Sequence, residues 1–189
     1  AVIFSAPIFL CFVYFILLAI FQVGVQNFLP TILIVDGFTL ALGTTALTAF
    51  LFASSGGTIV GAVLADRTPH QERLVAGGLL VAAITVAAIA FVHTAALIVG
   101  ALTIAGFALG LTLPPRDLLV RNATPRGATG RVFGFVYSGL DVGAAIAPIV
   151  IGVLLDNGET QWTLLLMSAS ALGAIGTTIA IARLTPRRV

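Results

Sequence analysis

The chain has 189 residues, of which 59% are hydrophobic and 8% are charged. Soluble globular proteins carry about 25% charged residues, so this composition excludes a large soluble domain and indicates an integral membrane protein. The net charge of +2 comes from nine arginines against seven acids. In a membrane protein such a bias reports topology, and no nucleic-acid partner is expected.

Six apolar stretches follow one another along the chain, and each is long enough to cross a hydrocarbon core of about 30 Å as a helix. We predict an all-α membrane protein in which residues 1–189 form a single six-span bundle. The predicted spans are residues 8–29, 38–64, 74–92, 95–113, 132–155 and 162–182.

The first stretch carries three amides, Gln22, Gln26 and Asn27, toward its second end. Gly24 and Pro30 weaken the helix there. Unmatched amides in lipid are unfavourable, so these side chains are expected to point inward, either to bind helices together or to line a polar path.

The second and fourth stretches end in polar segments. The second ends at Asp66 and Arg67, in a short loop. The fourth is predicted to stop at Pro114 and Pro115, because consecutive prolines do not continue a helix. The loop that follows, residues 116–131, is predicted to begin with a short amphipathic piece that lies along the membrane surface, with its arginines attracted to anionic lipid.

The fifth stretch has a carboxylate, Asp141, near its middle. A carboxylate at that depth is expensive to insert and is a candidate functional residue, provided that it faces protein or water. We weigh a direct role in coupling or substrate binding against a packed aspartate bonded to Tyr137 or Ser138. Small residues recur around it, and their spacing predicts close helix packing.

Charge in the connecting segments predicts the orientation. All nine arginines fall on one side of the membrane, and the opposite loops hold only Asp36, His93, Asp156 and Glu159. The positive-inside rule then places both ends of the segment in the cytoplasm. The chain begins with Ala1 and lacks a basic signal sequence, so we expect a fragment of a longer protein.

At three places the chain resembles the second half of a major facilitator superfamily (MFS) transporter of the bacterial drug or organic-anion type. These are the six spans, the signature Leu64-Ala65-Asp66-Arg67, and the segment PPRDLLVRNATPRGATGRVFGF that begins at Pro114. The signature departs from the family pattern, with Ala62 in place of the leading glycine. Gly139, Gly143 and Ala147-Pro148 also resemble the family's antiporter motif, with Ala147 standing for a glycine.

The resemblance implies a C-terminal bundle with a 3+3 inverted repeat in a bacterial inner membrane. It implies alternating access and a small-molecule substrate, with protons and an N-terminal six-span half of the same chain as partners, and no cofactor or metal. Asp141 and Tyr137 are candidates for proton coupling or substrate binding, and Gln22, Gln26 and Asn27 for the substrate path. Asp66, Arg67 and Arg131 would form a cytoplasmic gate, in which Asp66 faces the positive N-terminus of the fifth span.

Three other classes of membrane protein are alternatives to a transporter half. A membrane-embedded enzyme lacks support, because the sequence has no intramembrane nucleophile motif, and His70 and His93 lie in loops on opposite sides. The familiar channel filters are also missing. A self-contained six-span protein that dimerises remains open on sequence alone.

Overall fold

The computed structural model describes residues 5–124 and 127–184, and these residues are almost entirely helical. The first span is continuous from Ala6 to Val35 and consists of α1 (Ala6–Val23), one π-helical turn η2 (Gly24–Phe28) and α2 (Leu29–Val35). The others are α3 (Leu40–Arg67), α4 (Gln71–Ile89), α5 (Ala95–Ala123), α6 (Thr129–Asp156) and α7 (Thr160–Leu184). All six are long and apolar enough to cross a bilayer, as predicted.

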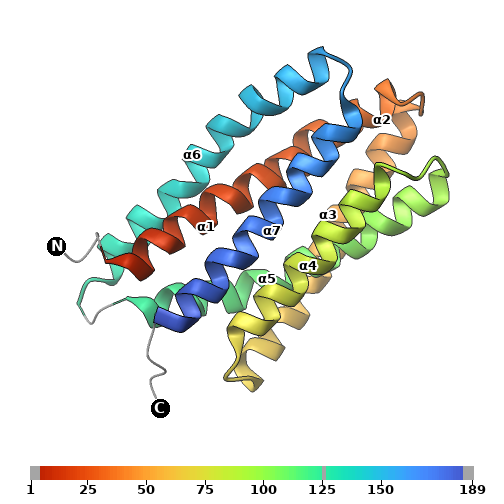
Figure 1. Cartoon of the computed structure of the whole chain (residues 1–189). Helices are drawn as coiled ribbons and strands as arrows, with labels where there is room; N and C mark the ends of the chain where they lie inside the picture. Colours follow the sequence, from red (N-terminus) through yellow and green to blue (C-terminus); the bar gives the residue numbers. More distant parts are fainter. Residues whose placement is uncertain (1–4, 125–126, 185–189) are drawn as a thin grey trace.

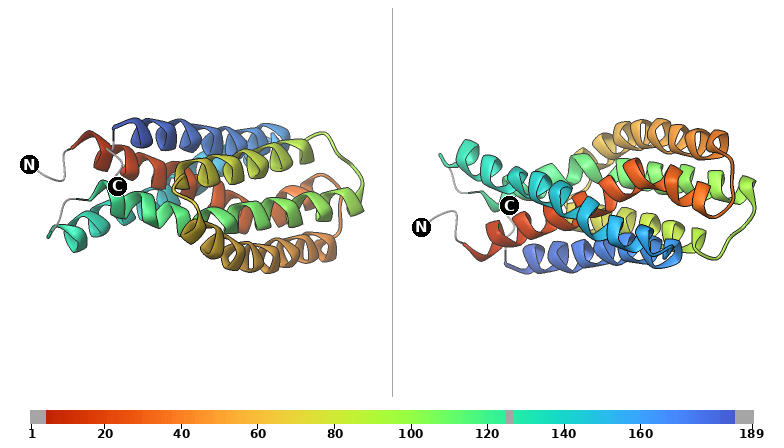
Figure 2. Two further views of the ribbon diagram at one scale, coloured as in Figure 1. Left: turned by 90° about the horizontal axis from the view of Figure 1, so that it is seen from below. Right: turned by 90° about the horizontal axis from the view of Figure 1, so that it is seen from above.

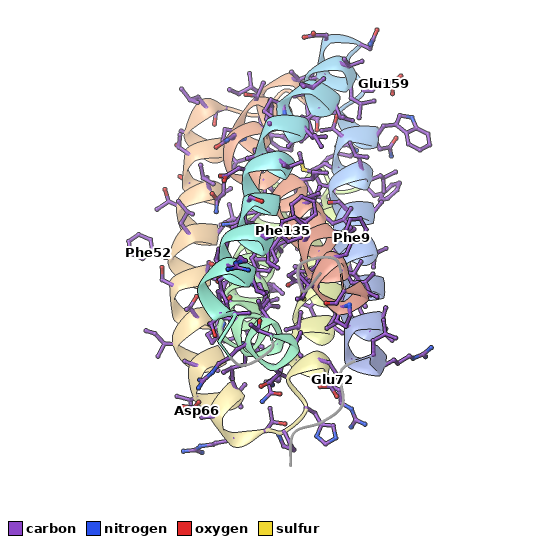
Figure 3. All side chains as sticks on the ribbon, turned by 90° about the vertical axis from the view of Figure 1, so that its left-hand side faces the viewer. Phe9, Phe52, Asp66, Glu72, Phe135 and Glu159 are labelled. Atoms are coloured by element: carbon purple, nitrogen blue, oxygen red, sulfur yellow. The ribbon has the colours of Figure 1, made fainter. Side chains whose placement is uncertain are left out.

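The spans run alternately up and down, so the connections gather at two ends (Figure 1). One end holds the start of α1, the end of α7, the α3–α4 connection, the end of α5 and the start of α6. We call it the arginine end, because Arg67, Arg73, Arg131 and Arg183 lie there. Figure 3 shows Asp66 and Glu72 at this end and Glu159 at the other.

The packing of the helices has an internal symmetry. Helix α1 packs on α6 and α7, α5 packs on α3 and α4, and α4 packs on α7. Exchanging α1 with α5, α3 with α6, and α4 with α7 turns this set of contacts into itself. The exchanged helices run in opposite directions (Figure 1). The bundle therefore has the 3+3 inverted arrangement that was expected from the resemblance.

Glycines allow close packing of α3 on α5 and of α6 on α1. On α3 and α5, two glycines of each helix face the backbone carbonyls of the other. On α6, a β-carbon on Gly139 would lie 2.7 Å from the carbonyl oxygen of Phe12, and one on Gly143 would lie 2.5 Å from that of Ile16. The small-residue packing predicted around Asp141 is therefore present against α1.

Helices α3 and α6 lie along one side of the bundle and α4 and α7 along the other, with α1 and α5 between them (Figure 2). Of the six spans, α3 and α6 have the smallest share of their apolar residues buried inside the bundle, 17% and 22%. We call the exposed side chains of these two helices the α3/α6 face. Its large apolar members are Leu40, Leu51, Phe52, Ile59, Val60, Val63, Leu64, Val142, Ile146, Ile149, Val150 and Val153. Phe52 projects outward in Figure 3.

Two predicted helix ends were wrong. Helix α5 continues through Pro114 and Pro115 to Ala123, so residues 116–123 extend the span and form no separate surface piece. The first span likewise passes Pro30. Membrane helices tolerate proline where neighbouring backbone and local π adjustments accommodate the freed carbonyls. The carbonyl of Leu111, which Pro115 leaves without its helical donor, packs against Gly61 of α3. Pro125 and Arg126 lie outside the described residues.

Candidate functional site

Asp141 lies midway along α6 and is exposed on the bundle surface. It has no hydrogen bond or ion pair within residues 5–124 and 127–184. The two neighbours considered as its partners bond elsewhere. Tyr137 donates to Asp117, and the Ser138 hydroxyl donates to the carbonyl of Phe135 at 2.7 Å. The structure therefore contradicts the alternative in which Asp141 is packed and bonded to Tyr137 or Ser138.

Tyr137 belongs to a polar cluster that joins three helices. Its hydroxyl donates a 2.8 Å hydrogen bond to Oδ1 of Asp117 on α5. The Nε of Arg116 donates to the same oxygen at 2.9 Å, which makes an ion pair between neighbouring residues. The guanidinium carbon of Arg116 lies 4.9 Å from the centre of the Phe15 ring on α1, within the range of a cation–π interaction.

Aromatic rings surround this cluster on the side of α1 and α6. Phe15 and Tyr137 have ring centres 4.8 Å apart, and Phe12 stacks on Phe135 at 4.8 Å. Figure 3 shows Phe135 between α6 and α1. The Arg116 side chain is only 11% exposed, whereas that of Asp117 is 44% exposed. The cluster therefore shields a cation under aromatic rings and leaves the carboxylate partly open.

Tyr14 adds a buried hydroxyl to α1, one residue before Phe15. Its ring centre lies 5.5 Å from that of Phe15. The side chain is 3% exposed, and its hydroxyl is without a hydrogen-bond partner among the described residues. An unpaired buried hydroxyl costs about 1–3 kcal/mol.

Sequence analysis did not find Arg116, Asp117 or Tyr14 as site residues. The double proline led to the prediction that Arg116 and Asp117 lie in a surface loop. Tyr14 lies within a long apolar stretch, where no sequence pattern singles it out. The available signal was the adjacency of Arg116 and Asp117 to a membrane span, because charges that continue a span are rarely without partners.

The three amides of the first span lie on or beside the π-helical turn. Gln26 and Asn27 are within η2, and Gln22 comes two residues before it. Gln22 and Gln26 are half-buried and Asn27 is exposed. At Gly24, a β-carbon would lie 2.8 Å from the side chain of Met167 on α7, so Met167 occupies the notch that this glycine provides.

The three predicted gate residues lie at the arginine end. Asp66, Arg67 and Arg131 are all exposed and unpaired within the described residues. The N-terminus of α6, the expected target of Asp66, has no side-chain cap. Within the same residues, no three potential metal ligands gather at one place.

The family model of the Major Facilitator Superfamily matches residues 10–189, which is nearly the whole chain. The chain belongs to this superfamily. No curated protein sequence matches it closely enough to be called a relative. Members of the superfamily move small molecules across membranes and are transporters rather than enzymes. The six spans of this MFS chain place it in the lipid bilayer as an integral protein.

Proposed function

We propose that this MFS chain is one six-helix half of a secondary transporter, which works by alternating access and couples substrate movement to protons through Asp141. The observation that carries the proposal is an exposed carboxylate midway along α6. A carboxylate at that depth costs several kcal/mol if it faces hydrocarbon. It therefore requires protein or water next to it, and the six described spans supply neither.

A second six-span half would cover the α3/α6 face. Helices α3 and α6 share one side of the bundle and bury the least of their surface. A polar pathway between two such halves would give Asp141 access to water from alternate sides. The other half would come from the same polypeptide, N-terminal to this segment.

Within this pathway, Tyr137 and the three amides Gln22, Gln26 and Asn27 would contact the substrate. Gln22 and Gln26 are half-buried and have no hydrogen-bond partner within the described residues, so their amides are available. The π-helical turn supports this role, because such turns occur frequently at functional sites in helices.

At the arginine end, Asp66, Arg67 and Arg131 would close the pathway on the cytoplasmic side. The uncapped N-terminus of α6 carries a partial positive charge that attracts a carboxylate. The arginines support a cytoplasmic location for this end and for both ends of the segment, and we infer that the protein lies in the inner membrane of a bacterium.

The test is transport by the complete protein in proteoliposomes under an imposed pH gradient. Asp141→Asn is expected to abolish gradient-driven accumulation while exchange of substrate across the membrane continues. Asp156→Asn is the matched control, because Asp156 is an exposed carboxylate at the end of the same helix. Normal accumulation by Asp141→Asn would refute proton coupling at this residue. If accumulation fails only for cationic substrates, Asp141 pairs with the substrate and does not carry the proton.

A further inference from the structure

Arg116 and Asp117 form an ion pair in which each side chain keeps an open binding position. Both donors that reach the carboxylate, the Nε of Arg116 and the hydroxyl of Tyr137, bond to Oδ1. The other oxygen, Oδ2, accepts no hydrogen bond from the described residues, and the Asp117 side chain is 44% exposed. A carboxylate with one occupied and one open oxygen can accept a further donor.

The guanidinium of Arg116 also has an open end. Of its N–H groups, only the one on Nε has a hydrogen-bond partner within residues 5–124 and 127–184. The terminal nitrogens, Nη1 and Nη2, are not among the fully buried unpaired atoms of these residues, so they keep some exposed surface. The bond at Nε and the contact with the Phe15 ring hold the group in place. Its terminal nitrogens are therefore available to an oxyanion, which they can bind with two parallel hydrogen bonds.

The charges of this pair decide which ligands fit it. The pair is neutral as a whole, and it lies near the end of α5, within the membrane-spanning helix. An organic anion would leave the site with a net negative charge and an organic cation with a net positive one, and a net charge is costly in a membrane interior. A zwitterion brings both charges and no net charge. It can therefore pair with both open groups at once without charging the site.

Aromatic rings beside the pair favour an apolar side chain on such a ligand. Phe12, Phe135 and Tyr137 are only partly buried, so their rings remain accessible. Phe12 and Phe135 stack with ring centres 4.8 Å apart. Tyr137 also precedes Asp141 by one helical turn, so the two residues lie on the same face of α6. The ion pair, which is bonded to Tyr137, therefore adjoins the face of α6 that carries Asp141.

We propose that Arg116 and Asp117 bind a zwitterionic ligand with an apolar side chain, of which an aromatic amino acid is the simplest example. The carboxylate of the ligand pairs with the terminal nitrogens of Arg116, and its ammonium group pairs with Oδ2 of Asp117. The rings of α1 and α6 contact its side chain. That this ligand is the transported substrate rests on the proposed transport function; the recognition of its two charges does not.

The test is equilibrium binding to the complete protein in nanodiscs without a pH gradient, measured by isothermal titration calorimetry. Three probes share a phenyl group and differ in charge. Phenylalanine carries both charges, hydrocinnamate lacks the ammonium group, and phenethylamine lacks the carboxylate. Phenylalanine is expected to bind about tenfold more tightly than either of the others, because each missing charge removes a hydrogen bond between charged groups.

Two variants should change the preference among the probes in opposite directions. Arg116→Gln is expected to weaken the binding of phenylalanine by about tenfold and to leave phenethylamine bound as tightly or more tightly, because a repelling cation is removed. Asp117→Asn is expected to weaken phenylalanine similarly and to favour hydrocinnamate, while the amide oxygen still accepts from Tyr137. Arg121→Gln is the matched control, since Arg121 is an exposed arginine in the last turn of the same helix. It should leave all three affinities unchanged.

Opposite shifts separate ligand recognition from a structural role, because a variant that only loosens the bundle weakens all three probes alike. If one of the two variants does not fold, the other still has its own expected order of affinities. A native protein that binds none of the probes, or binds a singly charged one as tightly as phenylalanine, would overturn the zwitterion site. The native order of affinities in both variants would overturn it as well. Failure of proton coupling at Asp141 would leave the order of affinities intact, so the two proposals fail separately.

Discussion

Gly110 on α5 packs so closely on Ser54 of α3 that a β-carbon on the glycine would collide with the backbone carbonyl of Ser54. Gly57 of α3 meets the carbonyl of Phe107 in the same way from the other helix. Membrane helices gain little from burying apolar surface against one another, because lipid is equally apolar. Close backbone contact therefore supplies much of the attraction between α3 and α5.

Gly110→Ala is expected to destabilise the protein by about 1–3 kcal/mol, because the added methyl group meets backbone that cannot move aside. Gly100→Ala is the matched control on the same helix, where nothing lies within 4 Å of the added carbon. It should be neutral or stabilising by up to about 1 kcal/mol. Thermal unfolding in detergent measures both, and equal melting temperatures would contradict the tight α3–α5 contact.

Met167→Ala is expected to cost about 2 kcal/mol or more, because Met167 is fully buried and fills the notch at Gly24. Met167→Leu preserves most of the volume and should cost less than about 1.5 kcal/mol. Leu172→Ala is a control on the same helix, since Leu172 is 48% exposed. If all three variants unfold at the same temperature, Met167 does not stabilise the bundle by filling the notch at Gly24.

Asp66→Asn is expected to open the arginine end without unfolding the protein, because Asp66 is exposed and its proposed partner is the N-terminus of α6. Reporter cysteines in the pathway should become more reactive toward a cytoplasmic thiol reagent. Glu159→Gln, an exposed acid at the opposite end, should leave their reactivity unchanged. Unaltered labelling in Asp66→Asn would remove the latch.

Ala145→Cys and Ala169→Cys test what covers the α3/α6 face. Both alanines are exposed near the middle of a span, Ala145 one turn from Asp141 on α6 and Ala169 on α7. In the complete protein, Ala145→Cys should react with a charged thiol reagent, which enters water but not hydrocarbon. Ala169→Cys should react only with a lipid-soluble one. The buried Cys11 contributes no background.

The same labelling pattern in both cysteine variants would mean that lipid covers the α3/α6 face. Cross-linking of Ala145→Cys to a second copy of the chain would instead favour a dimer of six-span proteins.

The sequence was sufficient for the number of spans, their alternating direction and the position of Asp141 near the middle of a span. Each follows from a local property: a run of apolar residues, the position of arginines between runs, or a lone charge within a run. These properties do not depend on which helices touch. The glycine spacing around Asp141 also predicted a close helix contact, but not that α1 is the helix contacted.

The tertiary structure decided how far α5 extends and which groups meet at its end. Pro114 and Pro115 are helix breakers by local rules, yet the helix continues because α3 packs against the freed backbone. The extension carries Asp117 to Tyr137, twenty residues further along the chain, and Arg116 to Phe15, about a hundred residues earlier. Contacts between residues so far apart depend on three-dimensional packing, which local sequence patterns do not specify.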